Sequence, residues 1–150
     1  MIKKSLVAIA VLLLFAARGA YADCSFQIDV ADSLGFPVSA MTAESSCGTV
    51  SVTLTHTGSL PKQAMGHNWV LTRSADFQAV APAGMSAGVA GNYVPAGDAR
   101  VIANTKLIGG GESDTVEFSL DGLAPGDYTF YCSFPGHWSA MKGTFTITAS

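Results

Sequence analysis

Apolar and polar residues alternate with a period of two along several segments of this chain, and this pattern limits the possible fold more than any other feature. A period of two places every second side chain on one face of a strand, whereas a helix has a period of about 3.6. The alternating apolar residues are Phe26, Ile28 and Val30, then Val50, Val52 and Leu54, and then Val116, Phe118 and Leu120. Turn-forming Gly, Pro, Asp and Ser residues separate these short segments. We therefore predict an all-β sandwich or barrel rather than alternating helices and strands.

Residues 74–90 do not follow the alternation and are predicted to form a short helical flap between strands. Ser74 can cap a helix there, while Pro82 and Gly84 limit its length. The apolar positions spaced for one helix face are Phe77, Val80 and Ala81. The flap therefore interrupts an otherwise all-β domain.

Residues 1–22 contain the three parts of a secretory signal peptide. A charged start with Lys3 and Lys4 precedes an apolar run over residues 6–17, and small residues follow at 20 and 22. The apolar run is shorter than the ~20 residues that a membrane-spanning helix needs, so a retained anchor is the weaker alternative. We predict a cleaved signal peptide over residues 1–22.

The remaining 128 residues, 23–150, are enough for one domain with a sizeable core. This segment carries five basic and eleven acidic residues, a formal charge of −6. Such a charge disfavours nucleic-acid partners, because phosphates would be repelled. A basic patch on a protein partner would be attracted, but charge alone does not identify that partner.

The exported segment contains three cysteines, and an oxidising compartment favours pairing of two of them. Cys24 begins the first predicted strand and Cys47 precedes another, whereas Cys132 lies among potential metal ligands. The economical prediction is a Cys24–Cys47 disulfide with Cys132 left as a thiolate. Closing a loop of about twenty residues contributes about 3 kcal/mol in the chain-entropy model.

Cys132, His137 and Met141 bring a thiol, an imidazole and a thioether within ten residues, and His67 supplies a second imidazole. Two imidazoles, one thiolate and a weak axial thioether are the ligands of a blue copper centre. Strand phase predicts that three of these side chains point into the core at strand ends. Cys132 shares the phase of Tyr128 and Phe130, His67 that of Trp69 and Leu71, and Met141 that of Phe145 and Ile147.

Residues 23–150 resemble the azurins, bacterial blue copper proteins of the cupredoxin family. The similar segments are MGHNWVL at 65–71, TKLIG at 105–109, CSFPGH at 132–137 and MKG at 141–143, and the Cys24/Cys47 pair fits as well. The resemblance implies an eight-stranded Greek-key β-sandwich of the cupredoxin type with one copper ion. It also implies a periplasmic protein that is not an enzyme and that shuttles single electrons through the exposed edge of His137.

The resemblance also implies roles for individual residues. His67, Cys132 and His137 would bind copper in a plane, with Met141 and the Gly66 carbonyl oxygen as axial contacts. Asn68 would brace the loop beside the cysteine, and the Phe134 amide would donate a hydrogen bond to the thiolate. The apolar electron-transfer patch around His137 would comprise Leu34, Leu60, Met65, Met85, Phe134, Pro135 and Gly136.

The implied partners are redox proteins such as c-type cytochromes or periplasmic reductases, which a monomer would meet in transient complexes. A copper-binding storage or delivery module is the alternative function, since it would use the same ligands. Trp138 departs from many azurins, which carry a small residue there, and it would either pack on the loop rim or contact a partner. His56 is in phase with Leu54 and is expected to be partly buried, hydrogen-bonded and sensitive to pH without binding copper.

Overall fold

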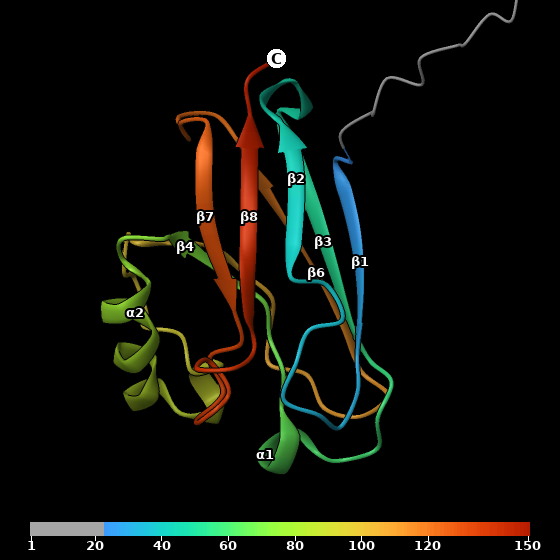
Figure 1. Cartoon of the computed structure of the whole chain (residues 1–150). Helices are drawn as coiled ribbons and strands as arrows, with labels where there is room; N and C mark the ends of the chain where they lie inside the picture. The colour runs from blue at the N-terminus through green and yellow to red at the C-terminus, as the bar shows by residue number, and fades with distance from the viewer. Residues whose placement is uncertain (1–22) are drawn as a thin grey trace, which may run out of the picture.

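The computed structural model describes residues 23–150, and the predicted signal peptide lies outside these described residues (Figure 1). Over residues 23–150 the chain forms eight strands, which confirms the predicted all-β fold. The strands are β1 (Ser25–Val30), β2 (Ala40–Glu44), β3 (Thr49–His56), β4 (Val70–Arg73), β5 (Val101–Asn104), β6 (Ser113–Ser119), β7 (Gly126–Tyr131) and β8 (Lys142–Thr148). No helix in this part of the chain is long and apolar enough to cross a membrane.

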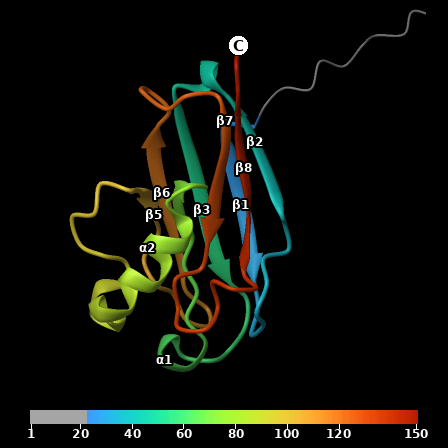
Figure 2. The same cartoon turned by 60° about the vertical axis from the view of Figure 1, so that its left-hand side comes forward.

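The strands form two sheets that face each other as the layers of a sandwich (Figures 1 and 2). One sheet has the order β1-β3-β6 and the other the order β2-β8-β7-β4-β5. β1 runs parallel to β3 and β2 parallel to β8, while the remaining pairs are antiparallel. Only β4–β5 and β7–β8 are both consecutive and paired, so the chain changes sheet at most connections, as expected for a Greek-key sandwich.

The core lies between the sheets and is built from the residues that share the inward phase. Val50, Val52 and Leu54 of β3 are fully buried, and the residues between them face outward. Trp69 stacks on Phe118 at 5.9 Å between ring centroids. The other aromatic rings around Trp69 are Phe130 and Phe145. Burying a large apolar side chain contributes about 1.5–3 kcal/mol, so this aromatic centre is a main source of stability.

Cys24 and Cys47 form the predicted disulfide, with their Cα atoms 5.6 Å apart. The bridge joins the residue before β1 to a short 3₁₀ turn, η1 (Ser45–Cys47). It closes a loop with a sequence separation of 23 residues, which stabilises the fold by about 3 kcal/mol in the chain-entropy model. Both elements lie at the upper end of the sandwich in Figure 1, opposite α1 (Lys62–Met65).

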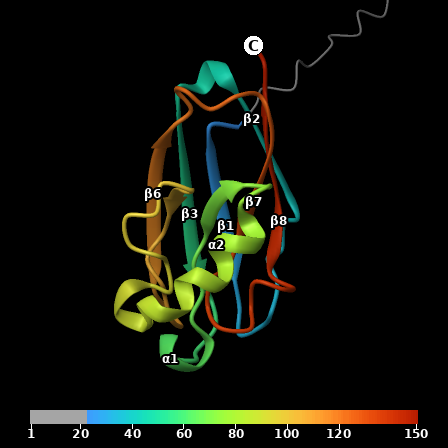
Figure 3. The same ribbon diagram turned by 90° about the vertical axis from the view of Figure 1, so that its left-hand side faces the viewer.

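The predicted flap contains α2 (Phe77–Ala83) and η2 (Gly84–Ala87), and η3 (Val89–Gly91) begins within its last residues. In Figure 3, α2 lies over the side of the sandwich that contains β4 and β7. Its predicted apolar face is buried, and the ring of Phe77 contacts Tyr131 of β7 edge-on at 5.2 Å. The flap therefore has a small apolar cluster of its own on the outer face of the five-stranded sheet.

One detail of the flap prediction was wrong. Ser74 does not cap the helix, because α2 begins later, after Asp76, and the Ser74 hydroxyl donates instead to the Asp127 carbonyl at 3.2 Å. Pro82 lies inside α2, but the helix ends at the next residue, Ala83, and Gly84 is its C-cap, so both residues limit the helix as predicted.

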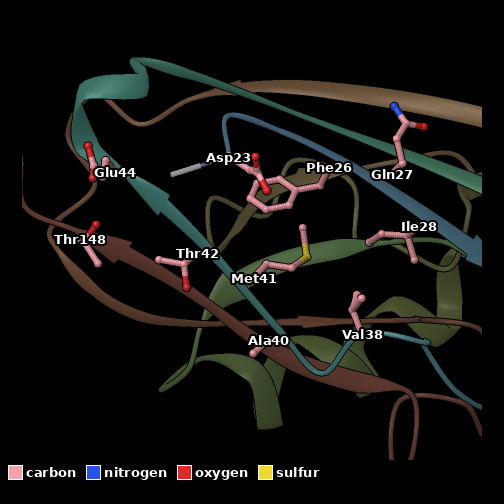
Figure 4. A pocket seen from close by; sticks show the side chains of 10 residues that line it. All are labelled: Asp23, Phe26, Gln27, Ile28, Val38, Ala40, Met41, Thr42, Glu44 and Thr148. Carbon is pink, nitrogen blue, oxygen red and sulfur yellow. The ribbon is translucent and has the colours of Figure 1, made fainter. Parts of the chain in front are cut away.

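A groove of about 530 Å³ lies between β1 and β2, where the edges of the two sheets meet. Phe26, Ile28 and Met41 contribute apolar side chains to it, and Asp23 and Glu44 contribute carboxylates (Figure 4). Both strands are edge strands, so no third strand of the described chain, residues 23–150, covers this side of the sandwich. None of the potential metal ligands lines this groove.

Candidate metal centre

The structure brings His67, Cys132 and His137 together, with one potential donor atom from each lying within 4.8 Å of the others. The Cys132 sulfur lies 3.8 Å from His67 Nδ1 and 3.6 Å from His137 Nδ1. The Gly66 carbonyl oxygen lies 3.9 Å from the same sulfur. Met141 is fully buried beside Cys132, whose backbone N–H donates to the Met141 carbonyl at 3.0 Å. The residues predicted as ligands therefore form one buried cluster.

Strand ends place these side chains. Cys132 directly follows β7 and Met141 directly precedes β8, so the two residues close the same hairpin. His67 precedes β4 and pairs with Ile108, through hydrogen bonds of 3.0 and 2.8 Å between the two backbones. The cluster therefore lies at the lower end of the sandwich in Figure 1, next to the ends of β4, β7 and β8 in the five-stranded sheet.

The loop between Cys132 and Met141 turns back on itself so that His137 faces the sulfur. Gly136 has φ 82°, a left-handed conformation that favours glycine. The His137 N–H donates to the Phe134 carbonyl at 2.9 Å, and the His137 carbonyl accepts from Met141 N–H at 2.7 Å. These bonds make the loop a compact turn and fix the backbone position of His137.

The ring of His67 is oriented by a residue that the sequence did not indicate. Its Nε2–H donates to the Ala31 carbonyl, just after β1, at 2.9 Å. Because Nε2 carries the proton, the lone pair of Nδ1 faces the Cys132 sulfur and is available to a metal. The packing of one sheet on the other brings Ala31 to this ring, and no sequence motif predicts that contact.

Burial controls the protonation of the cluster. It raises the pKa of Cys132 to about 11, and the backbone N–H groups of Asn68 and Phe134, directed at the sulfur, offset part of that rise. Burial also lowers the pKa of His67 to about 4 and lowers that of His137. At neutral pH the metal-free site thus holds a neutral thiol and two neutral imidazoles, and a metal would displace the thiol proton.

Asn68 links the two ligand-bearing segments. Its side-chain oxygen accepts from the Ser133 N–H at 2.8 Å, and its Nδ2 donates to the Ser133 hydroxyl at 2.7 Å. The brace expected of Asn68 is therefore present as a contact. Sequence reasoning missed Ser133, although a small polar residue directly after Cys132 was a usable signal.

The side chains fit a copper ion by their chemistry. Buried polar groups normally have good hydrogen-bond partners, whereas within residues 23–150 the partner of His67 Nδ1 is the weak thiol of Cys132 at 3.8 Å. A thiol, two imidazole nitrogens and a nearby thioether without any carboxylate are soft and borderline donors, which favour copper over calcium, magnesium or manganese. The copper ion implied by the sequence therefore fits this cluster.

The predicted electron-transfer patch includes the large exposed apolar side chains of the described chain. Leu34 is 54% exposed, Leu60 is 40% exposed and Met85 is 47% exposed. Asp32 holds two of the loops together, because its carboxylate accepts from the backbone N–H groups of Ser59 at 2.9 Å and Leu60 at 3.1 Å. The other patch members are partly buried Met65, Phe134 and Pro135, and exposed Gly136.

His56 and Trp138 each adjoin one of the two histidines of the cluster. His56 is fully buried rather than partly buried, and it stacks on His67 at 4.9 Å. The expected hydrogen bond is present, between its Nε2 and the Met65 carbonyl at 3.0 Å. Trp138 is partly buried and contacts Phe77 edge-on at 6.2 Å, so the structure supports packing on the loop rim.

Acid should destabilise the metal-free protein. The pKa of His67 falls from 6.5 to about 4 on folding, so between these values the unfolded chain binds a proton that the folded chain does not. The free energy of unfolding therefore decreases as the pH falls through this range, by about 2 kcal/mol at pH 5 from this residue. Urea unfolding at pH 8 and pH 5 measures this decrease in the free energy of unfolding. The variant His67→Gln should lose the part of the pH dependence that His67 causes. If the variant and the parent protein showed the same pH dependence, His67 would not be its source.

Comparisons with known proteins agree with this geometry. The family model described as "Copper binding proteins, plastocyanin/azurin family" matches residues 22–148. Azurin from Pseudomonas fluorescens biotype A is 53% identical over 127 residues, covering 84% of this chain and 99% of that protein. Azurin from Bordetella pertussis is 49% identical over 148 residues, covering 98% and 99%.

A solved structure is similar as well. The azurin Az-iso2 from Methylomonas sp. strain J superposes with a TM-score of 0.80 at 41% identity, covering 85% of this chain and 99% of that one. The family model, the sequence relatives and the solved structure all point to the plastocyanin/azurin family, and the buried cluster of copper-type ligands agrees with them. This chain therefore belongs to the plastocyanin/azurin family of copper-binding proteins.

Proposed function

We propose that this protein carries single electrons between redox proteins by means of one copper ion. The ligands are His67, Cys132 and His137, with Met141 and the Gly66 carbonyl oxygen as weaker contacts. The observation that carries the proposal is the convergence of two imidazole Nδ1 atoms and one sulfur at a buried point. When bound, copper supplies a Cu(I)/Cu(II) couple that a thiolate and imidazoles hold in both oxidation states.

The protein contributes a rigid, dry environment to this couple. His67 is fixed by the Ala31 carbonyl, and Cys132 lies between backbone N–H groups of Asn68 and Phe134. These groups are in place before an electron arrives, so the ligands need little rearrangement when the charge changes. The thiolate is shielded from water, which restricts reaction with small molecules and supports an electron carrier rather than an enzyme.

The electron would enter and leave through His137. His137 is 4% exposed, and the Phe134 ring packs against its imidazole at 4.5 Å between ring centroids. The patch of Leu34, Leu60 and Met85 offers an apolar surface that a partner can cover briefly. Partners of this kind are redox proteins such as c-type cytochromes or periplasmic reductases, in transient complexes with a monomer.

We place the mature protein, residues 23–150, in the periplasm after removal of residues 1–22 as a signal peptide. The Cys24–Cys47 disulfide supports an oxidising compartment. The 128 residues of this segment are close to the 127 residues that match the Pseudomonas fluorescens azurin almost completely. Mass spectrometry of the exported protein tests this assignment. A mass that corresponds to a chain beginning at Asp23 would support it, and a mass that includes residues 1–22 would contradict it.

An electron carrier should exchange electrons rapidly between its own oxidised and reduced molecules, whereas a storage or delivery module has no such need. We expect Met85→Glu to slow electron self-exchange by about tenfold or more, because two like charges would meet in the contact patch. Nuclear magnetic resonance line broadening in mixtures of the Cu(I) and Cu(II) forms measures this rate.

Thr115→Glu is the matched control, because it adds the same charge to an exposed position in β6 on the outer face of the three-stranded sheet. This variant should exchange electrons at a rate close to that of the parent protein. Slow exchange in the parent protein itself would favour the storage or delivery function. Equal slowing in both variants would show that Met85 is not in the contact patch.

A further inference from the structure

A hydrogen-bonded network joins the residues that follow two of the proposed ligands, and it converges on Asn92. The Asn92 carbonyl accepts from Asn68 Nδ2 at 2.8 Å and from the Ser133 hydroxyl at 3.1 Å. Asn68 follows His67, and Ser133 follows Cys132. One carbonyl oxygen beyond the flap therefore contacts both ligand-bearing segments.

The side chain of Asn92 reaches a third segment. Its Oδ1 accepts from the backbone N–H of Leu107 at 2.9 Å. The next residue, Ile108, pairs with His67 through both backbone groups. Asn92 thus contacts the partner segment of His67 as well as the residues after both ligands.

The backbone of Asn92 holds its carbonyl in this direction. Asn92 has φ 58° and ψ 20°, and Tyr93 has φ 53°, so two successive residues are left-handed. Asparagine tolerates this conformation better than most residues. A Cβ atom on Gly84 would overlap the Tyr93 carbonyl oxygen, so the turn lies directly against η2. Close packing therefore leaves the turn little freedom.

Tyr93 approaches the site by a second path. Its ring contacts Phe134 edge-on at 5.5 Å, and Phe134 packs on the His137 ring. Asn68 and Ser133 are almost completely buried, and hydrogen bonds are stronger where water is excluded. The turn at residues 92 and 93 is therefore packed against all the segments that carry imidazole or thiol ligands.

We propose that Asn92 is a positioning residue for the copper site. Through its carbonyl and its Oδ1 it fixes the spacing between the segment of His67 and the segment of Cys132. That spacing holds the Asn68 backbone N–H on the sulfur, and hence sets the electronic environment of the thiolate. The inference rests on the copper site proposed above, but its hydrogen bonds exist without the metal.

Asn92→Gly distinguishes the contribution of the side chain from that of the backbone. Glycine keeps the left-handed turn and the carbonyl but removes Oδ1. We expect the Leu107 amide of the metal-free variant to exchange with deuterium about tenfold faster than in the parent protein. After addition of Cu(II), the absorption of the variant should show a shifted thiolate-to-copper band. An unchanged exchange rate and an unchanged band would overturn the proposal.

Two further variants make the test specific. Asn92→Asp retains an acceptor for the Leu107 N–H and should restore slow exchange and the parent band. Ser119→Ala removes a bond of the same kind at Asp121, 3.0 Å long and remote from the ligands, and should leave the band unchanged. A band shift of equal size in Ser119→Ala would show a general structural effect and overturn the proposal.

The two proposals fail in different ways. If the parent protein with Cu(II) lacks an intense band, the proposed function fails, and the positioning of a copper site fails with it. If the parent band is intense but Asn92→Gly changes only thermal stability, the copper function stands and Asn92 has no positioning role.

Discussion

Replacing Cys132 with serine is expected to abolish the intense visible absorption of the copper-loaded protein and its electron self-exchange. The absorption requires charge transfer from a thiolate, and a serine hydroxyl stays protonated where the buried thiol, with a pKa of about 11, can still be deprotonated by a metal. The change removes no carbon atom, so the fold should be retained. Titration of the purified variant with Cu(II), followed by absorption spectroscopy, makes the measurement.

Met141→Leu is the matched variant for that experiment. Leucine preserves the volume of a fully buried side chain, and the Met141 thioether would be the weakest of the proposed copper contacts. Met141→Leu should therefore keep an intense band and change mainly the reduction potential. An intense band in Cys132→Ser would show that another residue supplies the charge-transfer donor.

Replacing Trp69 with alanine is expected to lower the free energy of unfolding by about 3–5 kcal/mol. The side chain is completely buried between the sheets, and its ring lies 5.9 Å from Phe118 and 6.0 Å from Phe130. Alanine would leave a cavity that these rings cannot fill without leaving their own contacts. Urea unfolding of the metal-free protein measures the loss.

Trp138→Ala is the control, because it removes the other tryptophan of the chain from a partly buried position. We expect this variant to lose about 1–2 kcal/mol, in proportion to its smaller burial. Trp69→Phe should also cost less than Trp69→Ala, since the Trp69 Nε1 has no hydrogen-bond partner within the described part of the chain. Equal losses for Trp69→Ala and Trp138→Ala would show that the core does not depend on Trp69.

The alternation of apolar residues predicted the sandwich and the direction of most ligands because both follow from local geometry. Val52 and Cys132 point inward for the same reason, namely that every second residue of a strand faces one side. His67 is less simple, because it lies before β4 and is held by a single bridge to Ile108. Even there the inward phase of Trp69 was a sufficient guide.

The contacts that the sequence did not reveal join segments that are distant along the chain. Ala31 contacts His67 through its carbonyl, which every residue carries, so no residue type could mark it. Asn92 acts through its left-handed turn as much as through its side chain. Ser74 was a reasonable cap by composition, but a tertiary hydrogen bond to Asp127 took its hydroxyl. Sheet packing decides such contacts after the local pattern is satisfied.

The hydrogen bond from His67 to the Ala31 carbonyl connects the two layers, since Ala31 follows β1 and His67 precedes β4. A chain in which only one layer has formed therefore has no oriented imidazole at residue 67. The arrangement of ligands seen in the folded cluster therefore requires the two layers to be docked, whether or not a metal contacts some of the same side chains earlier. We expect the full intensity of the visible band, during refolding with Cu(II), to develop together with docking of the two layers, so the band reports on layer packing separately from any signal of the backbone.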